Sequence, residues 1–127
     1  MEDIIQEMLN KKVWAVMGAS TNPEKYGYKI YKKLKDKGYT VYPINPRADK
    51  IDGDKCYKGL DELPEVPEVV NLVIPPKHTE KAVEKCIELG IKYLWMQPGA
   101  ESENAIKSAE QAGLKVVHNA CVYMLAV

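Results

Sequence analysis

The alternation of short apolar segments with helical segments constrains the fold more than any other feature of this sequence. Segments of four to six residues that are rich in apolar side chains predict strands at residues 13–17, 40–44, 69–74, 92–96 and 115–118. The spacing of apolar residues predicts helices at residues 1–11, 28–37, 79–89 and 101–112, with a short turn or helix at 119–127. Strands that alternate with helices form a parallel sheet covered on both faces. We therefore predict an α/β fold, a Rossmann-like three-layer sandwich with a five-stranded, mainly parallel sheet.

Length and composition set the remaining bounds on the class of protein. The 127 residues, 46% of them apolar, fit a single domain that spans residues 1–127. No apolar run approaches the roughly 20 residues of a membrane span, and residues 1–12 are too acidic for a signal peptide. The three cysteines lack CxxC spacing, which argues against a disulfide framework and a zinc site. We therefore expect a cytoplasmic protein that does not associate with membranes.

Charge is balanced over the whole chain but unevenly distributed along it. The chain has 18 basic and 18 acidic residues, and its net charge of zero argues against a general nucleic-acid-binding surface. Residues 24–58 contain ten Lys or Arg and five Asp or Glu, a net charge of +5, so the rest of the chain carries −5. The distribution excludes a broad surface for nucleic acid but is compatible with one compact phosphate ligand.

Loops at the carboxyl ends of the predicted strands are the expected ligand site, because ligands of open α/β sheets bind there. These loops lie at residues 18–28, 45–50, 75–79 and 97–102, and each contains proline or glycine. The pattern indicates four rigid or tightly turned loops gathered at one edge of the sheet.

The first two of these loops favour a phosphorylated adenosine over NAD. The dinucleotide fingerprint G-x-G-x-x-G keeps only Gly18, and the second strand ends in residues 45–47, Asn-Pro-Arg, instead of an acidic ribose ligand. Arg47 suits a phosphate on the ribose of adenosine. Backbone N–H groups around Ala19 and the hydroxyl of Ser20 are expected to hold a diphosphate at the start of the following helix.

Five segments of the chain resemble the signature segments of the small stand-alone CoA-binding proteins. They are residues 16–20 (VMGAS), 39–46 (YTVYPINP), 73–76 (VIPP), 95–102 (WMQPGAES) and 119–121 (NAC). These proteins are related to the CoA-binding domain of succinyl-CoA synthetase alpha subunits and of acyl-CoA synthetases. The resemblance covers nearly the whole chain, and the order of the five segments makes it specific. One departure is Ala120, because many relatives have arginine before the last cysteine.

The resemblance implies coenzyme A as the ligand and assigns a part of it to each loop. Residues 18–20 would hold the diphosphate, and residues 45–47 would border the adenosine and its 3′-phosphate. Residues 74–76 would line the adenine side, and residues 97–100 would flank the pantetheine arm. The candidate CoA-binding residues are Gly18, Ala19, Ser20, Asn22, Lys25, Asn45, Pro46, Arg47, Ile74, Pro75, Pro76, Gln97, Pro98, Gly99, Ala100, Asn119 and Cys121.

The sequence predicts no catalytic residue and no metal ligand. His118 and Cys121 are the one plausible nucleophile arrangement in the sequence. No acidic partner or oxyanion site can be identified beside them, so a structural role for Cys121 is favoured. Cys121 near the pantetheine end prompts the separate hypothesis of a mixed disulfide with CoA. Lys81 and Lys85 alternate with glutamates along the helix at residues 79–89, which indicates an exposed helix surface.

Three functional hypotheses follow. The first is a protein that binds CoA or an acyl-CoA at the carboxyl edge of the sheet without catalysis of its own. The second is an NADP-dependent redox protein, because Arg47 also suits a 2′-phosphate. The third is a detached CoA-binding subunit that works with an acyl-CoA synthetase partner.

Overall fold

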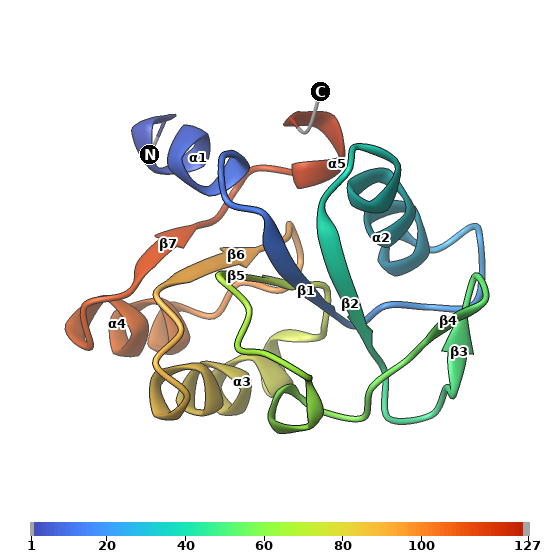
Figure 1. Ribbon diagram of the computed structural model, residues 1–127. Coiled ribbons are helices and arrows are strands. Elements are labelled where there is room, and N and C mark those ends of the chain that lie inside the picture. The colour runs from blue at the N-terminus through green and yellow to red at the C-terminus, as the bar shows by residue number, and fades with distance from the viewer. Residues whose placement is uncertain (1, 126–127) are drawn as a thin grey trace.

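The central sheet of the computed structural model, which describes residues 2–125, has five parallel strands (Figure 1). The strands are β1 (Val13–Met17), β2 (Thr40–Ile44), β5 (Val69–Leu72), β6 (Tyr93–Met96) and β7 (Lys115–Val117). Their order across the sheet is β2-β1-β5-β6-β7, and every neighbouring pair is parallel. The predicted α/β sandwich is therefore confirmed, and its sheet is parallel throughout.

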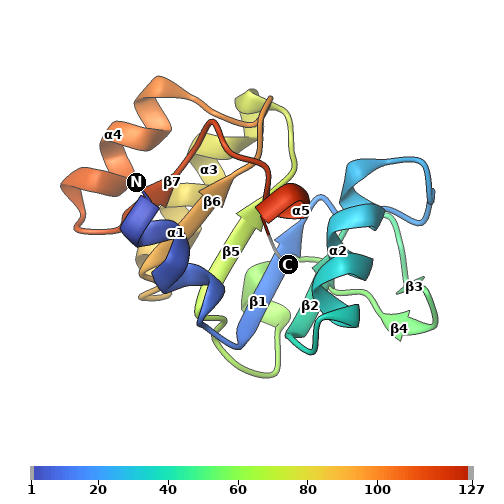
Figure 2. The ribbon, with the colours of Figure 1, turned by 90° about the horizontal axis from the view of Figure 1, so that it is seen from above.

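Helices cover both faces of this sheet. One face carries α1 (Glu2–Leu9), α2 (Tyr26–Asp36) and α5 (Val122–Leu125), as Figure 2 shows from above. The other face carries α3 (Pro76–Glu88) and α4 (Glu103–Gln111). Met1 of the first predicted helix and residues 126–127 of the last lie outside the described residues.

Alternation along each strand sends side chains into two separate cores. Trp14 and Val16 of β1 pack on the face of α1, α2 and α5, whereas Ala15 between them packs on the opposite face. Trp14 and Trp95 are both fully buried, with ring centroids 6.2 Å apart. The strands are apolar because both of their faces are covered.

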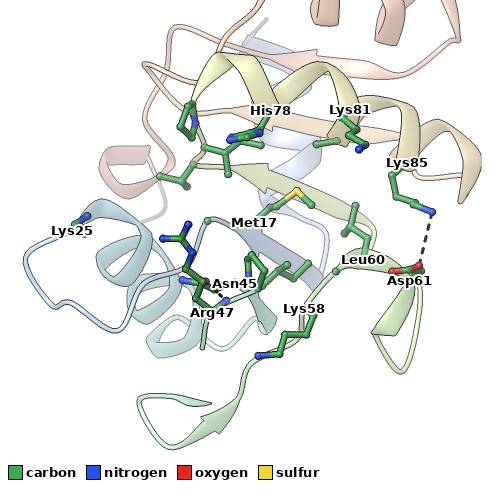
Figure 3. Close-up of a pocket in the computed structure, with 18 residues that line it drawn as sticks. Met17, Lys25, Asn45, Arg47, Lys58, Leu60, Asp61, His78, Lys81 and Lys85 are labelled. Atoms are coloured by element: carbon green, nitrogen blue, oxygen red, sulfur yellow. Dashed lines mark hydrogen bonds and ion pairs between the residues drawn. The ribbon is translucent and has the colours of Figure 1, made fainter. Parts of the chain in front are cut away.

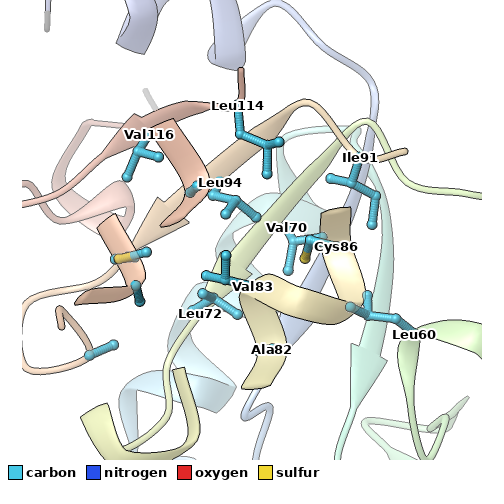
Figure 4. Close-up of a cluster of buried hydrophobic side chains, with 14 of the residues drawn as sticks. Leu60, Val70, Leu72, Ala82, Val83, Cys86, Ile91, Leu94, Leu114 and Val116 are labelled. Carbon is cyan, nitrogen blue, oxygen red and sulfur yellow. The ribbon is translucent and has the colours of Figure 1, made fainter. Parts of the chain in front are cut away.

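The core under α3 and α4 fixes the position of α3 on the sheet. Val83 and Cys86 of α3 are fully buried against Leu72 of β5 and Leu94 of β6 (Figure 4). Burial raises the pKa of the Cys86 thiol to about 12, so this cysteine behaves as an apolar core residue. Because α3 is anchored in this way, the backbone atoms that carry its exposed side chains are held in fixed positions.

Residues 45–64, for which no strand or helix was predicted, contain a small hairpin and a short helix. The hairpin pairs β3 (Lys50–Ile51) with β4 (Asp54–Lys55), and a 3₁₀ helix, η1 (Leu60–Glu62), follows it. Asp52 and Gly53 form the two-residue turn, with φ of 53° and 82°. Asp-Gly is the sequence that such a hairpin turn favours, but two-residue strands have too little periodicity to be predicted.

Two further boundaries differ from the prediction for identifiable reasons. α3 begins at Pro76 instead of residue 79, because proline fits the first position of a helix, where no N–H donor is needed. β5 ends at Leu72 instead of residue 74, after which the N–H of Val73 still donates to the carbonyl of Met17 at 2.8 Å. Residues 73–75 thus form the connection that leads over the sheet edge into α3.

The strand order places a crevice at the carboxyl ends of β1 and β5. The chain passes from β1 outward to β2 on one side, and then returns to β5 on the other side of β1. Connections that leave two adjacent strands in opposite directions open a crevice between them. Among residues 2–125, no helix has the length and apolar character needed to cross a lipid bilayer.

Candidate functional site

A pocket of about 700 Å³ lies at this crevice, between α3 and the segment that follows β2 (Figure 3). The carboxyl ends of β1, β2 and β5 form its floor, and residues 58–61 close the side opposite α3. It is lined by Met17, Gly18, Lys25, Ile44, Asn45, Pro46, Arg47, Lys58, Gly59, Leu60, Asp61, Val73, Ile74, Pro75, His78, Lys81, Ala82 and Lys85.

A second pocket of about 430 Å³ adjoins the first at the amino end of α2. The two pockets share Gly18, Lys25, Asn45 and Val73. The second is otherwise lined by Ala19, Ser20, Glu24, Tyr26 and Gly27. Together they form one continuous recess along the carboxyl edge of the sheet.

Two glycines allow the β1–α2 loop to approach the sheet closely. Gly18 has φ of 98°, and a Cβ atom there would lie 2.1 Å from the carbonyl oxygen of Val73. A Cβ atom on Gly27 would lie 2.1 Å from the carbonyl oxygen of Gly18. Gly27 was not recognised in the sequence, because it follows Gly18 by nine residues and lies outside any G-x-G-x-x-G spacing. It performs the close helix packing that the third glycine performs in that motif.

The donors available to an anion differ in part from those expected. The N–H groups of Gly18 and Ala19 both donate to the carbonyl of Ile44, at 3.0 and 3.2 Å, and are therefore occupied. The N–H groups of Tyr26 and Gly27, in the first turn of α2, have no acceptor among residues 2–125. Free donors thus lie at the helix start, as is usual for an N-terminus, and the N–H of Ser20 likewise has no acceptor among the described residues.

Asn45 connects the loop after β1 with the loop after β2. Its side-chain N–H donates to the carbonyl of Ala19 at 2.8 Å, and its Oδ1 accepts from the backbone N–H of Arg47 at 2.8 Å. In the first loop, Ser20 Oγ accepts from the N–H of Asn22, and Asn22 Oδ1 accepts from the N–H of Glu24, both at 3.0 Å. These bonds hold Arg47 beside the glycine loop.

The pocket combines an apolar floor with a basic rim. The floor consists of Met17, Ile44, Leu60, Val73, Ile74, Pro75 and Ala82. The rim carries Lys25, Arg47, Lys58, Lys81 and Lys85, with Asp61 as the one carboxylate. Lys58, Lys81 and Lys85 were not among the predicted site residues. Glu80 and Glu84, which alternate with Lys81 and Lys85 along the sequence, concealed the common orientation of these two lysines. Such a pocket suits a flat apolar group that carries several negative charges.

Nine of the predicted site residues line the two pockets, and the others lie elsewhere. The nine are Gly18, Ala19, Ser20, Lys25, Asn45, Pro46, Arg47, Ile74 and Pro75. Asn22 organises the first loop, and Pro76 is the exposed first residue of α3. Pro98, Gly99 and Ala100 follow β6 in a turn, where the carbonyl of Ala100 accepts from the hydroxyl of Thr79 at 2.7 Å.

Gln97 and Cys121 belong to a polar cluster beneath α5. Gln97 is buried, and its Oε1 accepts from Asn71 Nδ2 at 3.2 Å and from the N–H of Val122 at 2.9 Å. Its Nε2 donates to Cys121 Sγ at 3.2 Å. Asn119, just before this cluster, has φ of 60°. The hydrogen bonds secure α5 to the sheet, and the mixed disulfide of Cys121 with CoA stays a prediction.

A network of charged side chains fastens the β3–β4 hairpin to α2. Asp54 accepts hydrogen bonds from Tyr31 and Lys35, and Asp52 pairs with Lys32 at 3.2 Å. The hydrogen bond from Lys35, followed by that from Tyr31, lowers the pKa of Asp54 below its ordinary value of 3.8. Because the hairpin lies between Arg47 and Lys58, this network supports the wall of the pocket.

The Asp54→Asn substitution is expected to remove part of the stability that depends on pH. A carboxyl group whose pKa is lowered by folding binds fewer protons in the folded state, so its contribution is present at neutral pH and disappears as the pH falls below 3.8. The partly exposed network is screened by water, so we expect a loss of about 1 kcal/mol at pH 7 and a smaller loss at pH 3. Urea unfolding at the two pH values measures the difference. Asp49→Asn is the matched control, because Asp49 is 96% exposed and contacts Lys58 alone among the described cations; an equal loss in both variants would contradict the prediction.

Comparisons with known proteins agree in pointing to one family. A family model described as a CoA binding domain matches residues 12–126. A solved structure of a conserved hypothetical protein from Pyrococcus furiosus superposes with a TM-score of 0.85 and 42% identity, over 90% of this chain and 98% of that chain. An uncharacterized protein of Bacillus subtilis is 28% identical over 93% of this chain and 88% of its own length.

The chain is also similar to one part of larger enzymes. The alpha subunit of ADP-forming acetate–CoA ligase II of Pyrococcus furiosus is 28% identical over 94% of this chain. The chain spans between 11 and 28% of the length of the acetate–CoA ligases that it matches.

Proposed function

The chain belongs to the CoA binding domain family, and from this premise we propose that it binds coenzyme A, or an acyl-CoA, in the recess at the carboxyl edge of the sheet. The observation that carries the proposal is the pocket at the crevice between β1 and β5, with its apolar floor and basic rim. Adenine is flat and largely apolar on its faces, so it fits the floor beside Ile74 and Pro75. The diphosphate and the 3′-phosphate of CoA supply the negative charges that the rim would neutralise.

The diphosphate is assigned to the junction of the two pockets. The free N–H groups of Tyr26 and Gly27 and the positive end of α2 favour an anion there. Lys25 and Arg47 flank the same junction, and neither forms an ion pair with another side chain among residues 2–125. Their charge is therefore available to a ligand.

The pantetheine arm is expected to leave this junction along the edge of the sheet toward residues 97–100 and 119–121. These residues lie outside both pockets, so the arm would cross the surface instead of entering a tunnel. A thiol or acyl group placed in this way stays accessible to another protein. This placement favours a carrier or presenting role over catalysis by the chain itself.

A second candidate function is that of a CoA-binding subunit in a synthetase assembly. The observation in its favour is the similarity to the alpha subunit of an acetate–CoA ligase, of which the chain matches only one part. In that case the chain would act with a partner that supplies the nucleotide-dependent chemistry. Co-purification of the tagged chain with a synthetase chain from its native source would support this candidate over a free CoA-binding protein.

Calorimetric titration with CoA, dephospho-CoA and NADP tests the proposed function. CoA is expected to bind most tightly, and dephospho-CoA more weakly, because it lacks the 3′-phosphate that the basic rim would contact. NADP carries a phosphate at the ribose 2′ position and a nicotinamide instead of pantetheine. Its affinity therefore tests the alternative hypothesis of an NADP-dependent redox protein. Tightest binding of NADP, or the absence of CoA binding, would overturn the proposal.

A further inference from the structure

The five rim cations come from two opposite walls of the pocket and are not equally available to a ligand. Lys25 directly precedes α2, Arg47 lies in the loop after β2, and Lys58 follows β4. Lys81 and Lys85 belong to α3 (Figure 3). A cation that already pairs with a carboxylate offers less charge to a phosphate. The pairing of each cation therefore shows which of them is free for recognition.

Lys58 and Lys85 are engaged with other groups of the protein. Lys58 donates to the carbonyl of Ala48 at 3.2 Å and to the carboxylate of Asp49 at 3.1 Å. Lys85 lies 3.9 Å from Asp61 and 3.6 Å from Glu88. Both side chains hold parts of the rim together.

Lys81 is the free cation on the α3 wall. No carboxylate lies within 4.0 Å of its ammonium group among residues 2–125. Lys81 follows His78 by three residues and precedes Lys85 by four, so the three side chains share the face of α3 that lines the pocket. Ala82, the next residue, forms part of the apolar floor. The lysine therefore stands at the junction of floor and rim.

The backbone that carries Lys81 is held rigidly. Thr79, two residues earlier, is fully buried and donates its hydroxyl to the carbonyl of Ala100 at 2.7 Å. Val83 and Cys86 are fully buried in the core beneath α3. The helix cannot turn about its axis without breaking these contacts, so the Lys81 side chain extends from a fixed point beside the floor.

We propose that Lys81 recognises the phosphate on the adenosine ribose and sets the preference for CoA over dephospho-CoA. The inference rests on the proposed function and deepens it. A base that lies on the floor beside Ala82 brings its ribose within reach of the flexible four-carbon side chain of Lys81. The backbone of Arg47 is held beside the glycine loop through Asn45, and Arg47 lines the pocket together with Lys25. We therefore assign Arg47 to the diphosphate, whereas the family resemblance implies the 3′-phosphate for residues 45–47. Arg47 therefore contributes to the binding of both ligands, whereas Lys81 contributes to the binding of CoA alone.

The test compares the affinities of three variants for CoA and dephospho-CoA. Lys81→Gln is expected to lower the CoA to dephospho-CoA affinity ratio by about tenfold or more, the size expected for one charged hydrogen bond. Arg47→Gln is expected to weaken both ligands by similar factors and leave the ratio unchanged. Lys77→Gln, which removes an exposed lysine of the same helix outside the pocket, is expected to change neither affinity.

The outcomes separate the inference from the proposed function. An unchanged ratio in Lys81→Gln, with tight CoA binding by the wild-type protein, would overturn the inference alone. A fall in the CoA to dephospho-CoA affinity ratio in Arg47→Gln would assign the ribose phosphate to Arg47. That result would also overturn the inference about Lys81. Failure of the wild-type protein to bind CoA would overturn both. Because Lys81 is exposed and makes no ion pair with the described residues, a circular dichroism spectrum equal to that of the wild type is expected for the variant.

Discussion

Gly18→Ala is expected to lower the free energy of unfolding by about 3 kcal/mol or more. The new Cβ atom would lie 2.1 Å from the carbonyl oxygen of Val73 and 2.8 Å from its carbon, both of which belong to the backbone that leaves β5. Neither atom can move without disturbing the sheet edge. The backbone φ of 98° at this position adds strain for any residue with a side chain. Urea unfolding followed by tryptophan fluorescence would measure the loss.

Gly38→Ala separates the two causes of this expected loss. Gly38 has a similar φ of 94°, but a Cβ atom there would meet nothing within 4 Å. This variant therefore shows the backbone strain alone, about 1–2 kcal/mol. If Gly18→Ala were no less stable than Gly38→Ala, the close approach of the first loop to β5 would be wrong.

Gly27→Ala is expected to weaken CoA binding by at least tenfold while leaving the protein folded. The new methyl group would lie 2.1 Å from the carbonyl oxygen of Gly18, so the first turn of α2 must move away from the loop. That movement displaces the free N–H groups of Tyr26 and Gly27, which we assign to the diphosphate. Loss of one such charged hydrogen bond corresponds to about 1.5–3 kcal/mol of binding free energy.

Calorimetry with CoA measures this loss, and urea unfolding shows how much stability accompanies it. Alanine is favoured over glycine inside a helix by about 1 kcal/mol, which offsets part of the steric cost to stability. Gly38→Ala is again the control, because its position is open and distant in sequence from the loop. Unchanged CoA affinity in Gly27→Ala would contradict the assignment of the diphosphate to the start of α2.

The sheet could be predicted from the sequence because its strands are buried on both faces. Strands such as β1 and β5 are then nearly continuous apolar runs, and Gly18 and the proline pair at residues 75–76 mark their ends. The β3–β4 hairpin could not be predicted in the same way. Its two-residue strands are held by Tyr31, Lys32 and Lys35, which lie on another element.

The position of the site could be predicted, but several of its residues could not. The switch-point rule placed the ligand at the loops after β1, β2, β5 and β6. Residues of the first three loops line the two pockets, whereas residues 97–102 after β6 line neither. Lys81 and Lys85 alternate with glutamates, so the pattern indicated an exposed surface without showing which flank of α3 faces the recess. Gly27 was missed because its partner, the carbonyl of Gly18, is brought close by tertiary packing and not by a local motif.

The basic rim also has a kinetic consequence. Cations gathered around one recess concentrate the field there and guide an incoming polyanion, which raises the association rate constant at low ionic strength. Added salt would slow this encounter, because the Debye length falls to about 8 Å at physiological ionic strength. The apolar floor acts only after arrival, and its contacts govern how long the ligand stays. Stopped-flow measurements over a range of salt concentrations should therefore show an association rate that falls steeply while the dissociation rate changes much less.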